Sequence, residues 1–396
     1  MHLSKTTFLA FCLAITLPLT VFSQSLTWEI KPLALDTNEG VAIADFDGDG
    51  KLDVSAGRNW YHNPDFVARP LRNFGDVNGY AESNGDFVYD VDKDGRPDVI
   101  ATGFFDTKLM WFRNPGKEAL RLGQLWEPHL LVDTKNQQNE AQLFEDIDGD
   151  GTPEWIVNSW IADRPFLVWR FGKATQEVTV KEPGKPNHVV NVPALAQCTI
   201  GVNANGHGMA VGDLNGDGHK DIAMALNAVN VRYIKIFYGN GDGTFAPPKL
   251  IKGGSQSSFL TNHDMNMDGK SDLLSSSPMK DSISIFMGDG KGVFTKLDDF
   301  AGEKGPHNIV VGDFTGDKVP DIVVCNRRSA SISVIPGNGD GSFVYPHYNY
   351  VVGSQPRSIA GADFNRDGMM DIAVVLYQKK ILEVFLRKAT APPMDI

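Results

Sequence analysis

Short apolar runs of four to six residues recur along the chain, separated by polar, glycine-rich segments. Examples are VAIA at 41–44, VIATG at 99–103 and IVVC at 322–325. Runs of this length that are rich in β-branched residues are typical of short buried strands. Further runs follow in each repeat, as in LMWFRNPG, IKIFYGNGDG and ISVIPGNGDG. We therefore expect four strands in each repeat.

A nine-residue acidic segment lies between the first and second apolar runs of every repeat. The first copy is DFDGDGKLD at 45–53, and six further copies follow at intervals of 45, 56, 67, 51, 49 and 50 residues. Four strands in each repeat, seven times over, is the pattern of a β-propeller closed by radial repetition. The sequence therefore predicts an all-β fold, a seven-bladed β-propeller.

The acidic segments are predicted calcium loops. Carboxylates crowded at positions 1, 3 and 5 repel one another unless a cation lies among them, and a glycine at position 6 permits the sharp turn around the ion. An EF-hand would need a glutamate at position 12 between two helices, but Ala56 stands there and a strand-like run surrounds it. We expect a calcium loop between two strands.

The two ends of the chain have separate predicted roles. Residues 1–23 are typical of a signal peptide cleaved after Ser23, which predicts export to the periplasm or the extracellular space. We expect the propeller to span 24–388 and a tail to span 389–396, with no membrane span. The last repeat lacks a fourth strand, and LTWEIKPL at 26–33 is predicted to supply it and close the ring. A disulfide between Cys198 and Cys325 is left open.

The distribution of charged residues indicates what kind of partner the surface would bind. The net charge is −12, but the seven loops hold 24 of the 49 acidic residues, and the other 25 face 37 lysines and arginines. If cations fill the loops, the remaining surface is basic on balance, which favours an anionic partner. The exported chain lacks a basic cluster, so we expect no nucleic acid partner. We expect a monomer.

The DxDxDGxxD loops, together with turns such as GNGDGTF, resemble the FG-GAP and VCBS repeat family. This family includes calcium propellers of bacterial secreted proteins and of integrin alpha-subunit heads, and the resemblance covers nearly the whole mature chain. It implies six or seven calcium ions on the face opposite the usual ligand side. Asparagine at position 3 of the fourth, fifth and seventh loops implies weaker binding, and Lys318 in place of glycine leaves occupancy of the sixth loop in doubt.

The ligands implied by this resemblance follow the loop positions. In the first three loops they are Asp45, Asp47, Asp49, Lys51 and Asp53, then Asp90, Asp92, Asp94, Arg96 and Asp98, then Asp146, Asp148, Asp150, Thr152 and Glu154. In the other four they are Asp213, Asn215, Asp217, His219 and Asp221, then Asp264, Asn266, Asp268, Lys270 and Asp272, then Asp313, Thr315, Asp317 and Asp321, then Asp363, Asn365, Asp367, Met369 and Asp371. The residue at position 7 contributes its backbone carbonyl.

The interval between the third and fourth loops is longer than the others. Residues 172–201 are rich in proline and glycine, and we expect a blade edge followed by an extended surface loop. Such a loop is either decoration or a lid.

A polar ring is predicted at the mouth of the propeller, opposite the calcium loops. Counting six residues back from each loop gives Glu39, Asn84, Glu140, His207, Ser258, His307 and Arg357. Connections between second and third strands open on the same face and are expected to add Arg58, Trp60, Tyr61, His62, Trp160, Arg164, Lys280, Arg327 and Arg328. Aromatic rings beside cations suit a sugar that carries carboxylate or sulfate groups. Strand ends that face a water-filled channel are also commonly polar.

Two classes of function follow from this ring. The first is an extracellular module that binds an anionic polysaccharide or a partner protein. The second is an enzyme of the polysaccharide lyase or sugar dehydratase type, since the NWYHNP and MWFRNPG segments are similar to the propeller portion of fungal aldosulose dehydratases. In a lyase, Arg357 would neutralise a uronate carboxylate and His207 or His307 would take the alpha proton. Tyr61 or the other histidine would protonate the leaving oxygen.

Overall fold

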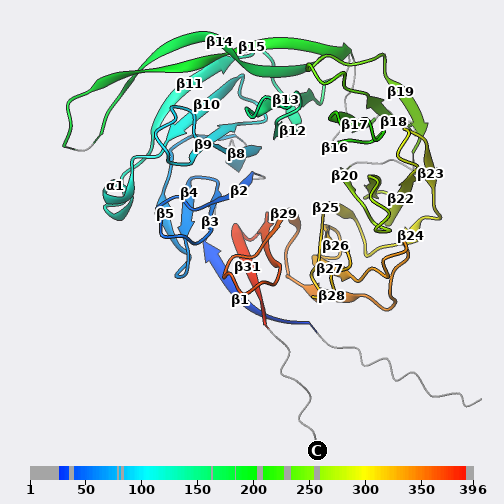
Figure 1. Cartoon of the computed structure of the whole chain (residues 1–396). Helices are drawn as coiled ribbons and strands as arrows, with labels where there is room; N and C mark the ends of the chain where they lie inside the picture. The colour runs from blue at the N-terminus through cyan, green and yellow to red at the C-terminus, as the bar shows by residue number, and fades with distance from the viewer. Residues whose placement is uncertain are drawn as a thin grey trace, which may run out of the picture.

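Seven antiparallel β-sheets are arranged around a central axis, so the chain folds as a seven-bladed β-propeller with almost no helix (Figure 1). The computed structural model describes residues 26–34, 40–77, 80–81, 84–161, 164–182, 184–202, 208–226, 233–253 and 259–388. This arrangement confirms the fold predicted from the seven repeats. The predicted signal peptide and the C-terminal tail lie outside the described residues and stay predictions.

Blades 1 to 6 are each built from strands that follow one another in the chain. Blades 1 to 3 comprise β2 (Val41–Ala44), β3 (Asp53–Ala56), β4 (Asn59–His62) and β5 (Val67–Pro70), then β8 (Gly85–Tyr89), β9 (Asp98–Thr102), β10 (Lys108–Arg113) and β11 (Glu127–Asp133), then β12 (Asn139–Glu145), β13 (Glu154–Ser159), β14 (Pro165–Val180) and β15 (His188–Val202).

Blades 4 to 6 repeat this order. They comprise β16 (Met209–Gly212), β17 (Asp221–Ala225), β18 (Tyr233–Phe237) and β19 (Lys249–Lys252), then β20 (Phe259–His263), β21 (Asp272–Ser277), β22 (Ser282–Gly288) and β23 (Phe294–Lys296), then β25 (Pro306–Gly312), β26 (Asp321–Asn326), β27 (Ser331–Ile335) and β28 (Tyr348–Val351). In blade 5, β24 (Phe300–Ala301) also pairs with β22. The short elements β6 (Asp76–Val77), β7 (Tyr80–Ala81) and α1 (Lys117–Arg121) lie between these strands in the chain.

The second strand of each blade carries the core. Every residue of β3, β9, β13, β17, β21, β26 and β30 (Asp371–Leu376) is buried. Both faces of such a strand pack against neighbouring blades, so its sequence reads as a continuous apolar run. These are the runs that follow each acidic segment in the sequence.

The N-terminal strand closes the ring, as predicted. Blade 7 consists of β29 (Pro356–Ala362), β30, β31 (Ile381–Lys388) and β1 (Thr27–Ala34), so the first strand of the chain pairs with the last. Their antiparallel register runs from Thr27 opposite Lys388 to Ala34 opposite Ile381. The Trp28 ring packs edge-on against Phe385, with centroids 6.1 Å apart. This strand therefore joins the two ends of the described chain.

The long interval after the third loop forms the outer strand of blade 3 and a long hairpin with two register shifts, so the prediction of an extended surface loop was wrong. β14 and β15 pair over most of their length and run along the outside of the ring (Figure 1). Val180 and Val192 are buried in one cluster with Trp111 and Leu131 of blade 2. The hairpin thus covers the outer edge of blade 2. Apolar residues at alternate positions pack one face of the hairpin there, although prolines and glycines lie nearby.

Two further observations bear on the sequence predictions. Cys198 and Cys325 are both free thiols, so the pairing that was left open is not formed. Within the described ranges, no helix is long and apolar enough to cross a membrane.

Candidate functional site

Each acidic segment forms a loop between the first and second strands of its blade, and all seven loops share one backbone pattern. The acid at position 1 accepts a hydrogen bond from the backbone N–H at position 6. The donor–acceptor distances lie between 2.7 and 2.9 Å. The repeat in sequence is therefore also a repeat in three-dimensional structure.

Position 6 requires a left-handed backbone. Six loops have glycine there, as at Gly50 and Gly95, each with φ of 87°. In the sixth loop Lys318 adopts φ of 67° and still donates its N–H to Asp313 at 2.9 Å. The turn therefore closes despite the Cβ that the sequence analysis marked as an obstacle, at the expense of a backbone conformation that L-residues rarely adopt. Occupancy of this loop by an ion stays a prediction.

The acid at position 9 has a structural role that the sequence analysis missed. In blade 2, Asp98 accepts hydrogen bonds from the backbone N–H groups of Val91, at 3.0 Å, and Asn114, at 2.8 Å. The equivalent acids of blades 1, 4, 5, 6 and 7 make the same two bonds. This residue therefore ties the loop to the end of the third strand or to one of the two residues that follow it. Its signal in the sequence is its position at the head of a fully buried strand.

Burial of these acids changes their protonation. Burial raises the pKa of Asp53 and Asp98 to about 7, although the hydrogen bonds that these carboxylates accept from backbone N–H groups oppose the rise. It also raises the pKa of Glu154 to about 7 and the pKa of Asp221, Asp321 and Asp371 to about 6, and the pKa of Asp272 is raised as well. Without a cation, each loop therefore holds an acid that resists ionisation.

Several loops could hold a cation. Carboxylate oxygens converge to within 4.8 Å of one another in four groups of the described residues: Asp45, Asp47 and Asp53; Asp90, Asp92 and Asp94; Asp146, Asp148 and Glu154; Asp313, Asp317 and Asp321. Convergent oxygen donors fit a hard cation such as Ca²⁺. The carbonyl ligands expected at position 7 and the asparagine ligands stay predictions.

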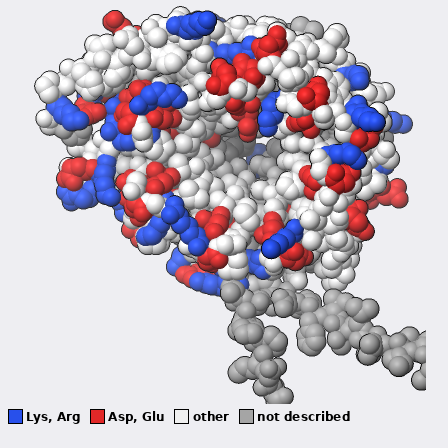
Figure 2. All heavy atoms as spheres, viewed as in Figure 1, with Lys and Arg blue, Asp and Glu red and all other residues white. Residues whose placement is uncertain are grey.

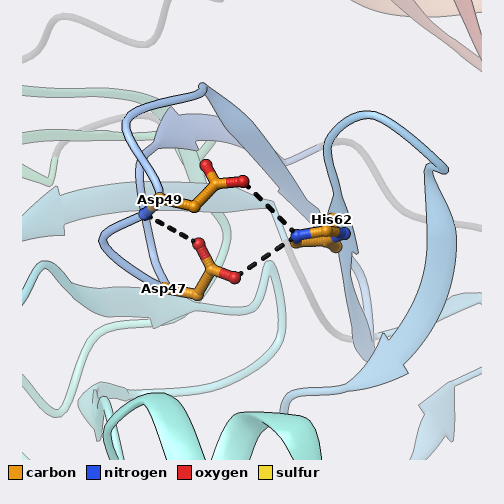
Figure 3. Close-up of side chains that lie close together, drawn as sticks. All are labelled: Asp47, Asp49 and His62. Atoms are coloured by element: carbon orange, nitrogen blue, oxygen red, sulfur yellow. Dashed lines mark hydrogen bonds and ion pairs between the residues drawn. The ribbon is translucent and has the colours of Figure 1, made fainter.

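His62 lies beside the first loop and away from the mouth. It ends β4 next to Asp47 and Asp49, with its Nε2 3.3 Å and 3.8 Å from their carboxylate oxygens (Figure 3). The prediction that His62 faces a ligand at the mouth was wrong. The third strand runs back toward the acidic loop, so its last residue reaches the opposite end of the blade.

Trp60 and Tyr61 are also misplaced in the sequence analysis. Both are fully buried in β4, Trp60 in a cluster with Phe46 and Trp126, and Tyr61 in a cluster between blades 1 and 7. Strand β4 begins at Asn59, so Trp60 and Tyr61 belong to this strand and not to the connection between β3 and β4. Burial excludes contact between Tyr61 and a substrate at the mouth.

A cavity of about 900 Å³ lies on the propeller axis. The innermost strands of all seven blades line it, and four members of the predicted ring lie there: Asn84, Glu140, His307 and Arg357. Figure 2 shows a face on which the centre of the ring is hollowed, with acidic and basic side chains around the hollow. The other members, Glu39, His207 and Ser258, lie outside the described residues.

Basic side chains gather in the cavity on blades 6 and 7. His307 is 9 % exposed, and its Nδ1 lies 3.2 Å from the carbonyl oxygen of Arg357. The Arg357 guanidinium lies 4.9 Å from the centre of the Tyr377 ring. Arg327, which also lines the cavity, donates from Nε to Gln355 at 3.2 Å.

The remaining predicted residues divide between the cavity and the outer surface. Trp160 and Arg328 line the cavity, and Arg328 pairs with Asp281. Arg58 instead donates to the carbonyl oxygen of Phe74 and packs on its ring. Arg164 and Lys280 are exposed, and Arg164 donates to Asn136. The structure thus brings part of the predicted set together.

The fold and the loops define a class of protein: β-propellers in which each blade carries an acidic loop between its two inner strands. A model of the FG-GAP-like repeat matches residues 90–157, 264–324 and 320–374. The β-propeller therefore contains FG-GAP-like repeats, as the resemblance of its loops implied.

Solved structures of low sequence identity share the fold. An Agrocybe aegerita lectin, solved for its specific recognition of non-reducing terminal N-acetylglucosamine, is 19% identical, with a TM-score of 0.55 over 83% of this chain and 90% of the lectin. BBS1N, solved in complex with ARL6DN, is 11% identical, with a TM-score of 0.55 over 92% of this chain and 98% of that one. No curated protein matches the chain in sequence. At these identities the likeness concerns the fold alone.

Proposed function

We propose that this protein is a secreted, calcium-stabilised β-propeller that binds an anionic carbohydrate at the mouth of its axial cavity. The observation that carries the proposal is the single cavity of about 900 Å³ in which Arg327, Arg357 and His307 lie on adjacent blades. Guanidinium groups bind carboxylate and sulfate oxygens in a bidentate manner. The partly exposed ring of Trp160 provides a surface on which a sugar can stack.

Calcium is the cation that suits the loops. Their convergent donors are carboxylate oxygens, and Ca²⁺ takes six to eight oxygen ligands in flexible geometry. When bound, the ion neutralises the crowded carboxylates and holds the loop in its turn. Its role in the proposal is to stabilise the blades, since His307 and Arg357 lie at the starts of their innermost strands and the loops follow the ends of those strands.

A non-catalytic role fits the cavity better than an elimination reaction. The lyase hypothesis needs an acid to protonate the leaving oxygen, and Tyr61, one of its two candidates, is buried in the sheet. All seven blades contribute to the cavity walls, so its lining is broad, as in a recognition surface. The likeness to a propeller lectin shows the fold alone, yet it agrees with binding at such a surface.

Calorimetric titration of the mature protein with uronate and sulfated oligosaccharides tests the proposal. We expect Arg357→Ala and Arg327→Ala each to weaken binding at least about tenfold, because each removes a charge-assisted contact of about 1.5–3 kcal/mol. Arg121→Ala, on the surface helix α1, is the matched control and should leave the affinity unchanged.

Three outcomes would contradict the proposal. If no anionic oligosaccharide binds, or if the arginine variants bind as tightly as the parent, the cavity does not recognise anionic sugars. If ultraviolet absorbance reveals an unsaturated product that His307→Ala abolishes, the protein is an enzyme and the non-catalytic role is wrong.

A further inference from the structure

A basic side chain faces the acidic loop in the first three blades. This side chain belongs to the residue that follows the last paired residue of the third strand. It therefore lies opposite the acid at position 9, which precedes the last paired residue of the second strand. In each case it contacts the acid at position 3. The pairs are His62 Nε2 with Asp47 at 3.3 Å, Arg113 Nε with Asp92 at 2.6 Å, and Arg170 Nε with Asp148 at 3.8 Å.

The other four blades lack both partners of this pair. Their position-3 residues are Asn215, Asn266, Thr315 and Asn365. Their third-strand residues at the same register are Tyr238, Met287, Pro336 and Leu386. A carboxylate at position 3 therefore occurs with a basic side chain, histidine or arginine, in all three of these blades, and a neutral residue there occurs with a non-basic partner in the other four. Within this chain, the repeats show that the basic residue compensates for the additional acid.

Blade 2 has the tightest of the three arrangements. Arg113 and Asp92 are only 3 % and 2 % exposed, and Arg113 Nη2 also lies 2.6 Å from an oxygen of Asp94. The same nitrogen lies 3.1 Å from Glu182 at the end of the long hairpin. The guanidinium thus joins the acids at positions 3 and 5, the residues that would converge on an ion. By comparison, the Arg170 contact in blade 3 is longer and its side chain is 23 % exposed.

The net charge of the blade 2 loop supports this comparison. Residues 90–98 with Arg113 have four acids and three basic residues, Lys93, Arg96 and Arg113, which sum to −1, whereas the three acids and Lys270 of residues 264–272 sum to −2. The fifth loop has no third-strand cation, because Met287 stands there. A guanidinium and a calcium ion among the same carboxylates would repel each other at close range. Loop 2 therefore has a buried cation between its acids at positions 3 and 5, whereas Lys270 of loop 5 is exposed and pairs with Asp268 at the loop surface.

We propose that Arg113 takes the place of the calcium ion in blade 2. Its guanidinium closes the loop by bonding Asp92 and Asp94 and ties the loop to Glu182 of the β14–β15 hairpin. Loop 2 then takes no calcium, whereas loop 5 depends on the ion. The inference rests on the calcium proposal above and adds that the loops differ in their need for metal.

The experiment transfers the residues of blade 5 into blade 2. Metal-free protein is titrated with Ca²⁺, and bound ions are counted by native mass spectrometry. Asp92→Asn with Arg113→Met reproduces Asn266 and Met287 and leaves the net charge of the loop and its partner unchanged. We expect this double variant to bind one more ion than the parent. Arg121→Met, an exposed arginine between the third and fourth strands of the same blade, is the control and should not change the count.

Hydrogen exchange of the unaltered protein provides a second measurement that needs no variant. Addition of Ca²⁺ should slow exchange in residues 264–272 and leave exchange in residues 90–98 unchanged. Calcium-dependent protection of residues 90–98, or an unchanged ion count in the double variant, would overturn the inference. A parent that binds no calcium at all while the double variant gains one ion would contradict only the calcium proposal for the other loops.

Discussion

Removal of calcium should invert the pH dependence of stability. The position-9 acids are buried, and burial raises the pKa of Asp98 to about 7 from an ordinary value of 3.8. In the metal-free fold the acid is therefore neutral at a pH where it is already ionised in the unfolded chain. The native state binds more protons, so the free energy of unfolding falls as the pH rises.

The magnitude follows from the pKa difference. The stability that the neutral carboxyl contributes is fully present below about pH 4 and is lost as the pH rises through about 7. A difference of about 3 in pKa corresponds to about 4 kcal/mol for one such group. The equivalent acids in the other blades shift in the same direction. Calcium binds the ionised form, so its stabilising effect should grow over the same pH range.

Thermal unfolding with and without calcium, at several pH values from about 5 to 8, measures this effect. The metal-free protein should lose Tm as the pH rises, and the gap between loaded and metal-free Tm should widen. Asp98→Asn lacks the titrating group, so the metal-free Tm of this variant should fall less steeply. A metal-free protein that becomes more stable between pH 5 and pH 8 would refute the reasoning, because the buried acids would then be ionised at no cost.

Three further predictions concern single sites. Arg72→Met leaves the buried charge of Asp86, 2.6 Å from the guanidinium, without this partner, and should cost about 3–5 kcal/mol in urea unfolding. The double variant with Asp86→Asn should recover much of that loss, and equal losses in both variants would contradict it. Lys318→Gly should stabilise the protein by about 1 kcal/mol, because glycine adopts a left-handed backbone without strain, and an unchanged urea midpoint would count against this. A thiol reagent should modify half-buried Cys198 in the native protein, but Cys325 only after unfolding, since Cys325 is buried and its burial raises the pKa of the thiol.

The features that the sequence predicts well are those that repetition makes visible. Seven acidic segments between apolar runs determine the number of blades, and a missing fourth strand in the last repeat leaves one place for the strand at 26–33. Each inference compares repeats of one chain. A single short apolar run can be either a strand or a segment of a buried helix, and comparison of the seven repeats resolves this ambiguity.

The sequence predicts poorly those features that depend on which end of a strand a residue occupies. His62 was assigned to the mouth because it follows the second strand closely, but the third strand begins at Asn59 and carries His62 to the acidic loop. A shift of three residues along a strand moves a side chain by about 10 Å. The same error placed Trp60 at the mouth, although it packs in the core.

The contacts also alter the argument from loop charge. From the sequence, the loops with an acid at position 3 have one more negative charge than the asparagine loops and should bind calcium more tightly. In the structure, a third-strand histidine or arginine lies against each of those additional acids. Affinity should therefore follow the charge of the loop and its third-strand partner together. On this basis the asparagine loop of blade 5 should bind calcium more tightly than the acid-rich loop of blade 2, in which Arg113 would oppose the ion.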